Sequence, residues 1–114
     1  MSAVDVLIVD DDVDIQEAVA EYLAVHGMTT HSASNGGEAA RLLEEGIQPR
    51  AILLDMAMPL VSGETFLDQL AAHPRWSSIP VIAMTGGQAR PGVKTLRKPF
   101  DGAALVALVR SVLR

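Results

Sequence analysis

Short apolar runs alternate with longer segments in which apolar residues recur every three or four positions. The short runs are typical of strands, and the longer segments are typical of amphipathic helices. We expect strands at residues 4–9, 28–33, 51–54, 80–84 and 93–97, and helices at residues 14–26, 35–45, 64–72 and 102–113. This alternation predicts an α/β fold with a parallel sheet and right-handed crossovers.

The expected helices carry recognisable ends and inner faces. Asp12 or Asp14 can cap the first helix, and Gly27 is a suitable stop signal. Its expected inner face consists of Ile15, Val19, Tyr22 and Leu23. The last helix has an inward stripe, but it also carries apolar residues elsewhere around its circumference. The stripe is Leu105, Leu108, Val109 and Val112, and the others are Ala103, Val106, Ala107 and Leu113. A helix that is apolar on most sides is usually buried on most sides.

Length, composition and charge indicate the number of domains and exclude or disfavour several kinds of site and partner. The chain has 114 residues, which suits one domain over residues 1–114. It has no cysteine, which excludes disulfides and thiolate metal sites. The net charge of −5 disfavours nucleic-acid binding, which needs clustered Lys and Arg. With no segment suited to a signal peptide or a membrane span, we expect a cytoplasmic protein without a membrane partner.

Polar residues follow four of the expected strands directly. Asp10 and Asp11 follow the first strand, Asp55 the third, Thr85 the fourth and Lys98 the fifth. Each of these residues alone is typical of a turn or a helix cap. In a parallel sheet, however, the carboxyl ends of all strands meet at one edge, where ligands bind. The sequence therefore predicts one site built from all five side chains.

These residue types suit phosphoryl transfer. Clustered carboxylates repel one another unless a cation lies among them. A site with oxygen ligands and no cysteine favours Mg²⁺ or a similarly hard ion. Such an ion allows Asp55 to remain an ionised nucleophile, while Lys98 and Thr85 provide a positive charge and a hydroxyl.

Four stretches together carry a family resemblance, and they read VLIVDDD, ILLDMAMPLVSG, VIAMTGG and LRKPF. They resemble the receiver domain of two-component response regulators, over essentially the whole chain. The resemblance implies a flavodoxin-like, doubly wound, five-stranded sheet with strand order 2-1-3-4-5. It implies a signalling switch that catalyses its own phosphorylation and dephosphorylation but is not otherwise an enzyme. A histidine kinase or phosphotransfer protein would donate the phosphoryl group, and a downstream protein partner would receive the signal.

The resemblance also implies roles for individual residues. Asp55 matches the phosphoacceptor, Asp11 a direct ligand of Mg²⁺, and Asp10 an acid that binds the ion through water. The backbone carbonyl of Ala57 matches the remaining protein ligand, and Asp12 is left as a helix cap.

Three further matches complete the implied site. Thr85 matches a hydroxyl that turns toward the phosphoryl group, and Lys98 matches a lysine that contacts it. The bond between Lys98 and Pro99 is expected to be cis. Pro59 and Gly63 match a loop after the acceptor, where they would shape the backbone.

The chain departs from the family pattern between the fourth and fifth strands. Lys98 follows Thr85 by only 13 residues. A helix alone typically takes about 11–12 residues. We therefore expect a loop over residues 86–92 in place of the fourth helix, as in single-domain receivers whose fourth helix is loop-like.

A second departure concerns the switch. The family usually has an aromatic residue where this chain has Thr95, three residues before the lysine. Our hypothesis is that phosphorylation reshapes the 86–92 loop instead; the alternative is a receiver that does not switch. Ala57 and Gly87 match positions that tune dephosphorylation, and their small size predicts that these two residues do not strongly prolong the phosphorylated lifetime.

Loss of a helix should uncover apolar surface near the fourth and fifth strands. Together with the last helix, this surface predicts a face for a partner or for a homodimer. Two other functions remain open. One is a receiver-like binding module that does not use phosphorylation. The other is a hydrolase of the haloacid dehalogenase type, which Ala57 disfavours because such enzymes usually carry a second Asp there.

Overall fold

Strands and helices alternate along the whole described part of the chain. The computed structural model describes residues 2–58, 63–87 and 92–113. The strands are β1 (Ser2–Val9), β2 (Thr30–Ala33), β3 (Ile47–Asp55), β4 (Val81–Thr85) and β5 (Lys94–Arg97). The helices are α1 (Val13–Val25), α2 (Gly36–Glu44), α3 (Gly63–Ala72) and α4 (Gly102–Val112).

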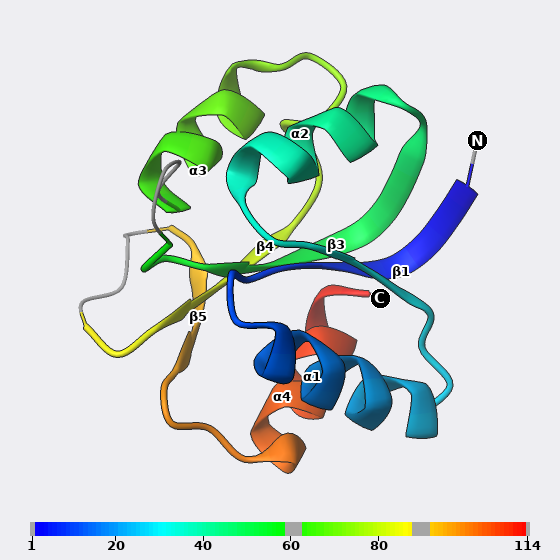
Figure 1. Cartoon of the computed structure of the whole chain (residues 1–114), viewed down its shortest axis with the longest axis vertical. Helices are drawn as coiled ribbons and strands as arrows, with labels where there is room; N and C mark the ends of the chain where they lie inside the picture. The colour runs from blue at the N-terminus through cyan, green and yellow to red at the C-terminus, as the bar shows by residue number, and fades with distance from the viewer. Residues whose placement is uncertain (1, 59–62, 88–91, 114) are drawn as a thin grey trace.

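The strands form one parallel sheet in the order β2-β1-β3-β4-β5, which confirms the expected fold. Helices α1 and α4 cover one face of the sheet, and α2 and α3 cover the other (Figure 1). This three-layer arrangement follows from right-handed crossovers in a sheet that starts from its middle and extends toward both edges.

Each face of the sheet has its own apolar core. The core beneath α1 and α4 includes Ile8, Leu23, Leu53, Met84, Leu105 and Val109. The core beneath α2 and α3 includes Leu7, Leu43, Ile52, Leu54, Phe66 and Trp76. Alternate residues of β1 and β3 therefore serve opposite cores, as the two-residue period of a strand requires. Burying a side chain such as Phe66 contributes roughly 1.5–3 kcal/mol to the hydrophobic term of folding.

Strand β3 begins at Ile47, four residues before the expected strand, and includes Pro49. Pro49 pairs only with Val4 of β1, because β4 begins opposite Ile52. A proline has no N–H to donate, so it is tolerated where one side of a strand lacks a neighbour. The pattern of the sequence alone does not show that β3 is longer than β4.

Two expectations near α1 are wrong. Strand β2 begins at Thr30 rather than at residue 28, because Met28 still belongs to the turn that ends α1 and its N–H donates to the Leu23 carbonyl. Tyr22 is 39% exposed, whereas Gln16 is buried on the inner face with Val19 and Leu23. Asp12 is the N-cap of α1, and its carboxylate accepts hydrogen bonds from the first turn.

The connection between β4 and β5 is short. None of its described residues, 86–87 and 92–93, is helical. The expected loop over residues 86–92 is confirmed in this part, and residues 88–91 lie outside the described residues. In the described part of this connection, no helix is present to cover the sheet as a longer crossover would.

The last helix differs from its expected packing. Val106 is buried with Leu105 and Val109, so it does not add to the outward surface. The outward side of α4 instead carries Ala103, Ala104, Ala107, Arg110 and Ser111. No helix in the described part of the chain combines the length and the apolar character that crossing a membrane requires.

Candidate functional site

The register of the sheet places the polar strand ends side by side. Val9 pairs with both Ala33 and Leu54, so Asp10 lies beside Asp55 at the end of the central strands. Asp55 pairs with Met84, and Thr85 pairs with Arg97, the residue before Lys98. All five residues expected at the sheet edge therefore follow or end adjacent strands.

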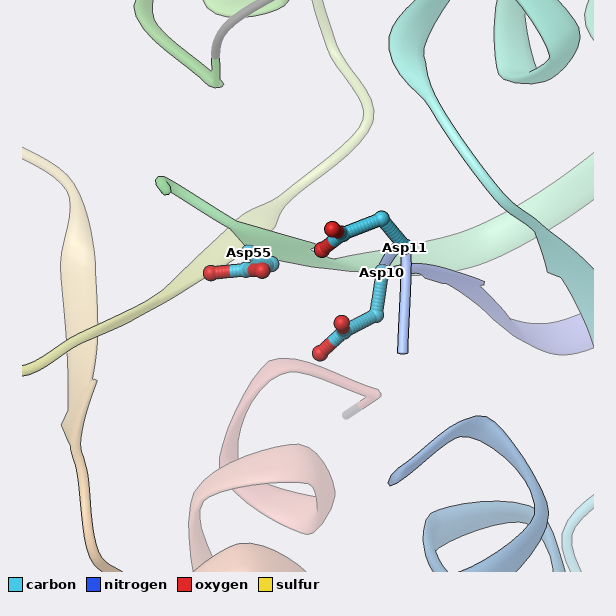
Figure 2. Close-up of side chains that lie close together, drawn as sticks. All are labelled: Asp10, Asp11 and Asp55. Atoms are coloured by element: carbon cyan, nitrogen blue, oxygen red, sulfur yellow. The ribbon is translucent and has the colours of Figure 1, made fainter. Parts of the chain in front are cut away.

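Three carboxylates meet at this edge. Asp10, Asp11 and Asp55 each offer one oxygen, and these oxygens all lie within 4.8 Å of one another. Figure 2 shows the three side chains gathered where β1 and β3 end. Asp10 and Asp55 are buried, with 0% and 3% exposure, whereas Asp11 is exposed. The cluster is thus rooted in the core but open to solvent on the Asp11 side.

Lys98 provides the positive charge of the site. Its Nζ lies 3.2 Å from Oδ1 of Asp55, which it donates to, and 3.9 Å from Oδ2 of Asp10. The backbone N–H of Lys98 donates to the Thr85 carbonyl at 2.9 Å. The peptide bond between Lys98 and Pro99 is cis. One ammonium therefore faces two of the three carboxylates, which leaves the cluster with excess negative charge.

Asp10 has an unsatisfied buried oxygen. Its Oδ1 accepts a hydrogen bond from the N–H of Asp12 at 2.9 Å, but its buried Oδ2 has no hydrogen-bond partner among the described residues. Lys98 is too distant from that oxygen for a hydrogen bond. The pKa of the Asp10 carboxyl is raised to about 6, mainly because the group is buried; the hydrogen bond from the Asp12 N–H lowers this pKa, and the nearby Asp55 charge raises it.

A hard cation fits this arrangement. The available donors are carboxylate oxygens, which Mg²⁺ prefers, and an orphaned buried oxygen would gain a partner. A cation would also favour the ionised form of Asp10. The residues present therefore fit the expected Mg²⁺ site.

Asp55 is held from two directions. Its Oδ1 accepts a hydrogen bond from the N–H of Ala57 at 3.1 Å as well as from Lys98. Gly63, at the start of α3, packs against the backbone of Asp55 and Met56. A Cβ at Gly63 would lie 2.7 Å from Cα of Met56 and 3.0 Å from the Asp55 carbonyl oxygen. Glycine is therefore required at position 63, because the backbone of Asp55 and Met56 lies too close for a side chain. Pro59 lies outside the described residues.

Thr85 lies at the end of β4, and its hydroxyl faces the following loop. Its Oγ1 accepts a hydrogen bond from the N–H of Gly87 at 3.0 Å. The Gly87 carbonyl in turn accepts one from Nη1 of Arg97 at 3.1 Å. Thr95 is half-buried, and its hydroxyl donates to the Val93 carbonyl at 3.3 Å. The loop after β4 is thus connected both to the Thr85 hydroxyl and to β5.

Two residues near the site were not expected from the sequence. Gln16 contacts the backbone beneath Asp10, and Arg97 contacts the loop at Gly87. The sequence did indicate an inward position for Gln16, because this residue lies three positions before Val19 and seven before Leu23 on the same helical face. No comparable pattern marks Arg97, since its contact depends on the path of the loop.

A separate hollow of about 450 Å³ lies at the start of β3, where Leu43, Pro49 and Trp76 contribute to its lining. This hollow is at the opposite end of the strands from the carboxylates. Its lining contains none of the expected site residues. The volume of a hollow therefore does not identify the functional site here.

Comparisons with known proteins agree with this geometry. The model of the response regulator receiver domain matches residues 6–110. The chain is 33% identical to the DNA-binding dual master transcriptional regulator RpaA of Synechocystis sp., over 96% of this chain and 48% of that protein. The chain thus spans about half the length of this curated relative.

Solved structures show the same fold. The signal receiver domain of a signal transduction histidine kinase from Syntrophus aciditrophicus has a TM-score of 0.87 and 28% identity, covering 96% of this chain and 89% of that one. The chemotaxis protein CheY4 of Vibrio cholerae has a TM-score of 0.86 with 24% identity, covering 99% of both chains, and it supports the fold alone. Because the family model covers most of the sequence, this chain belongs to the response regulator receiver domain family.

Proposed function

We propose that Asp55 accepts a phosphoryl group from a phosphohistidine of a histidine kinase or phosphotransfer protein in the cytoplasm. The chain would then signal to a downstream protein through contacts that depend on this modification. The observation that carries the proposal is the contact of 3.2 Å between Lys98 Nζ and Asp55 Oδ1 beside two further carboxylates. This arrangement combines a nucleophile with groups that stabilise charge during phosphoryl transfer.

The transfer step uses the carboxylate of Asp55 as nucleophile. Its Oδ1 already accepts hydrogen bonds from Ala57 and Lys98, so we assign the attack to Oδ2. A bond forms between Oδ2 and phosphorus while the bond between phosphorus and the donor imidazole nitrogen breaks. The imidazole keeps the electron pair and takes up a proton. Later, water attacks phosphorus, the acyl phosphate bond breaks, and the carboxylate and inorganic phosphate are released.

The surrounding residues would assist in distinct ways. Asp10, Asp11, Asp55 and the Ala57 carbonyl would hold Mg²⁺, which neutralises charge on the carboxylates and the phosphoryl oxygens when it is bound. Lys98 would move from Asp55 toward the new phosphoryl group. The Thr85 hydroxyl accepts from Gly87, so its own proton remains free to donate to a phosphoryl oxygen.

The response to phosphorylation would begin at Thr85. Movement of its hydroxyl toward a phosphoryl group would disturb its hydrogen bond with Gly87, and hence the contact between Gly87 and Arg97. Thr95 is too small to act as an aromatic relay, so the 86–92 loop is our candidate for the responding element.

Self-association stays a prediction, and α4 supports it less than the sequence suggested. The outward side of α4 carries alanines, an arginine and a serine, so it does not present the large apolar surface expected. The open edge of β5 remains as the candidate surface for a partner. Sedimentation at several concentrations, with and without beryllofluoride, tests this form of the prediction.

Intact mass measurement tests the acceptor. The protein is incubated with Mg²⁺ and a small phosphodonor, beside Asp55→Asn and the matched control Asp14→Asn, which removes an exposed carboxylate on α1. One phosphoryl group on the parent and on Asp14→Asn, with none on Asp55→Asn, is the expected result. An adduct on Asp55→Asn would refute the assignment. A folded parent that takes neither phosphoryl group nor beryllofluoride would favour a binding module that does not use phosphorylation.

A further inference from the structure

A buried amide lies directly beneath the two carboxylates at the end of β1. Gln16 of α1 is 9% exposed. Its Nε2 donates to the Asp10 carbonyl at 2.5 Å and to the Ala33 carbonyl at 3.2 Å, and it lies 3.3 Å from Oγ of Ser34. Carbonyl oxygens only accept hydrogen bonds, so the amide nitrogen, and not the amide oxygen, must face them.

These contacts hold the peptide group that joins Asp10 to Asp11. The carbonyl of this group is the one that accepts from Gln16. The next peptide group, between Asp11 and Asp12, is held through its N–H, which donates to Oδ1 of Asp10 at 2.9 Å. The backbone of Asp11 is therefore fixed on both sides, although its side chain is exposed. The direction of the Asp11 carboxylate depends on these two fixed peptide groups.

The fold does not need this amide to join β1 and β2. The N–H of Asp10 already donates to the Ala33 carbonyl at 3.0 Å, which closes the ladder at that point. An apolar side chain of similar length would avoid the cost of removing an amide from water, but it would leave the Asp10 carbonyl without this donor. The amide therefore serves the backbone at the carboxylates rather than the pairing of β1 with β2.

We infer that Gln16 is a positioning residue for the cation site, acting through the Asp10–Asp11 backbone. The inference rests on the proposed function, because it assumes that Asp10 and Asp11 hold Mg²⁺. Residues that orient the ligands of a metal typically change its affinity by about 10–100-fold when they are replaced. Gln16 has this relation to Asp11, since it fixes the backbone from which the ligand extends.

The test is a titration of the whole chain with MgCl₂, followed by amide NMR signals of the folded protein. Gln16→Met keeps the length of the side chain and removes the donor. We expect its dissociation constant for Mg²⁺ to rise by about tenfold. Without Mg²⁺, the amide signals of Asp11 and Asp12 should shift more than those at the far end of the sheet.

Two controls separate positioning from stability. Gln69→Met makes the same replacement at an exposed site on α3, and Leu43→Ala weakens the core away from the carboxylates. Both should bind Mg²⁺ as the parent does, because a dissociation constant measured on folded protein does not report global stability. If Gln16→Met does not fold, Gln16→Asn, which is too short to reach the Asp10 carbonyl, is titrated instead.

A rise of about fivefold or more in Gln16→Met, with both controls unchanged, supports the inference. A smaller rise overturns it. Titration of the parent and of Asp11→Asn tests the cation site independently. A parent that binds Mg²⁺ through Asp11, together with a Gln16 variant that binds equally well, would refute the role of Gln16 alone. Failure of the parent to bind Mg²⁺ would refute the cation site itself.

Discussion

Lys98 Nζ lies 3.2 Å from Oδ1 of Asp55, so a cation that directly follows the edge strand β5 contacts the proposed phosphoacceptor that ends β3. The two strands are not neighbours, because β4 lies between them. Lys98 reaches Asp55 across the end of β4, where its backbone N–H is hydrogen-bonded to the Thr85 carbonyl. Asp55, Thr85 and Lys98 are therefore held at the ends of three adjacent strands.

Replacing Lys98 should slow chemistry more than it affects folding. In Lys98→Ala, phosphorylation by a small phosphodonor is expected to fall by about 10²-fold, because a group that stabilises transferred charge is lost. The side chain is 29% exposed, so the fold should tolerate the change. A time course of intact mass measures the rate, with Lys94→Ala, at an exposed site on β5, as the control. Equal rates in the parent and Lys98→Ala would contradict this role.

The buried carboxyl of Asp10 should make stability depend on pH. Its pKa is raised from 3.8 to about 6, mainly because burial disfavours the charged form. The folded protein therefore holds this proton more tightly than the unfolded chain does. Without metal, the free energy of unfolding should fall as the pH rises from about 4 to about 6, by up to roughly 3 kcal/mol. Above this window Asp10 should add no further change.

Urea unfolding in EDTA across this range measures the effect, and Asp10→Asn is the control because it cannot titrate. As the pH rises, the free energy of unfolding of the parent should therefore fall relative to that of Asp10→Asn. Parallel curves for the two proteins would show that the folded pKa of Asp10 is not raised.

Gly63 should not accept even one additional carbon. In Gly63→Ala, the new Cβ would lie 2.8 Å from Sδ of Met56 and closer still to Met56 Cα. Backbone adjacent to Asp55 must then shift, and we expect a loss of about 1–3 kcal/mol in stability with slower phosphorylation. Gly86→Ala is the matched control, since no described atom beyond its chain neighbours lies within 4 Å of its Cβ position. Urea unfolding measures the stability of both variants. Equal stabilities of Gly63→Ala and Gly86→Ala would refute the close approach at Gly63.

The loop after β4 should respond most to a phosphate mimic. When beryllofluoride and Mg²⁺ are added, the amide signal of Gly87 is expected to change strongly, because its partner Thr85 should move toward the mimic. In Arg97→Gln the link between this loop and β5 is weakened, so signals of β5 should respond less than in the parent. Amide NMR spectra provide the measurement. An unchanged Gly87 signal, with large changes in distant helices, would contradict the proposal.

Side chains at positions 57 and 87 should set the lifetime of the acyl phosphate. Ala57 and Gly87 are both small, and a Cβ at Gly87 would lie 3.8 Å from Thr85 Oγ1, which is an ordinary contact. Ala57→Gln and Gly87→Glu should therefore fold and change the rate of hydrolysis severalfold, because a polar side chain can position or exclude water. Decay of the phosphorylated mass measures this rate. Unaltered decay in both variants would exclude the tuning role.

Most of the candidate site was predictable from local pattern. Polar site residues end or directly follow β1, β3, β4 and β5, and a parallel sheet brings the carboxyl ends of its strands to one edge. Asp10, Asp55 and Lys98 could therefore be grouped without coordinates. The wrong expectations concern the start of β2 and the faces of helices. Tyr22 and Val106 sit near the boundary between inward and outward positions, where periodicity alone does not decide burial.

The sequence by itself determined the order of strands and helices, the residues at the strand ends and the shortness of the connection between Thr85 and Lys98. These features depend on chain length, turn residues and apolar periodicity, which are local properties. Only the tertiary structure decided that Asp10 is buried while the adjacent Asp11 is exposed, and that Gln16 lies beneath both. Desolvation and hydrogen bonding at Asp10 depend on neighbours from α1, β2 and β5, which only the packed fold brings together.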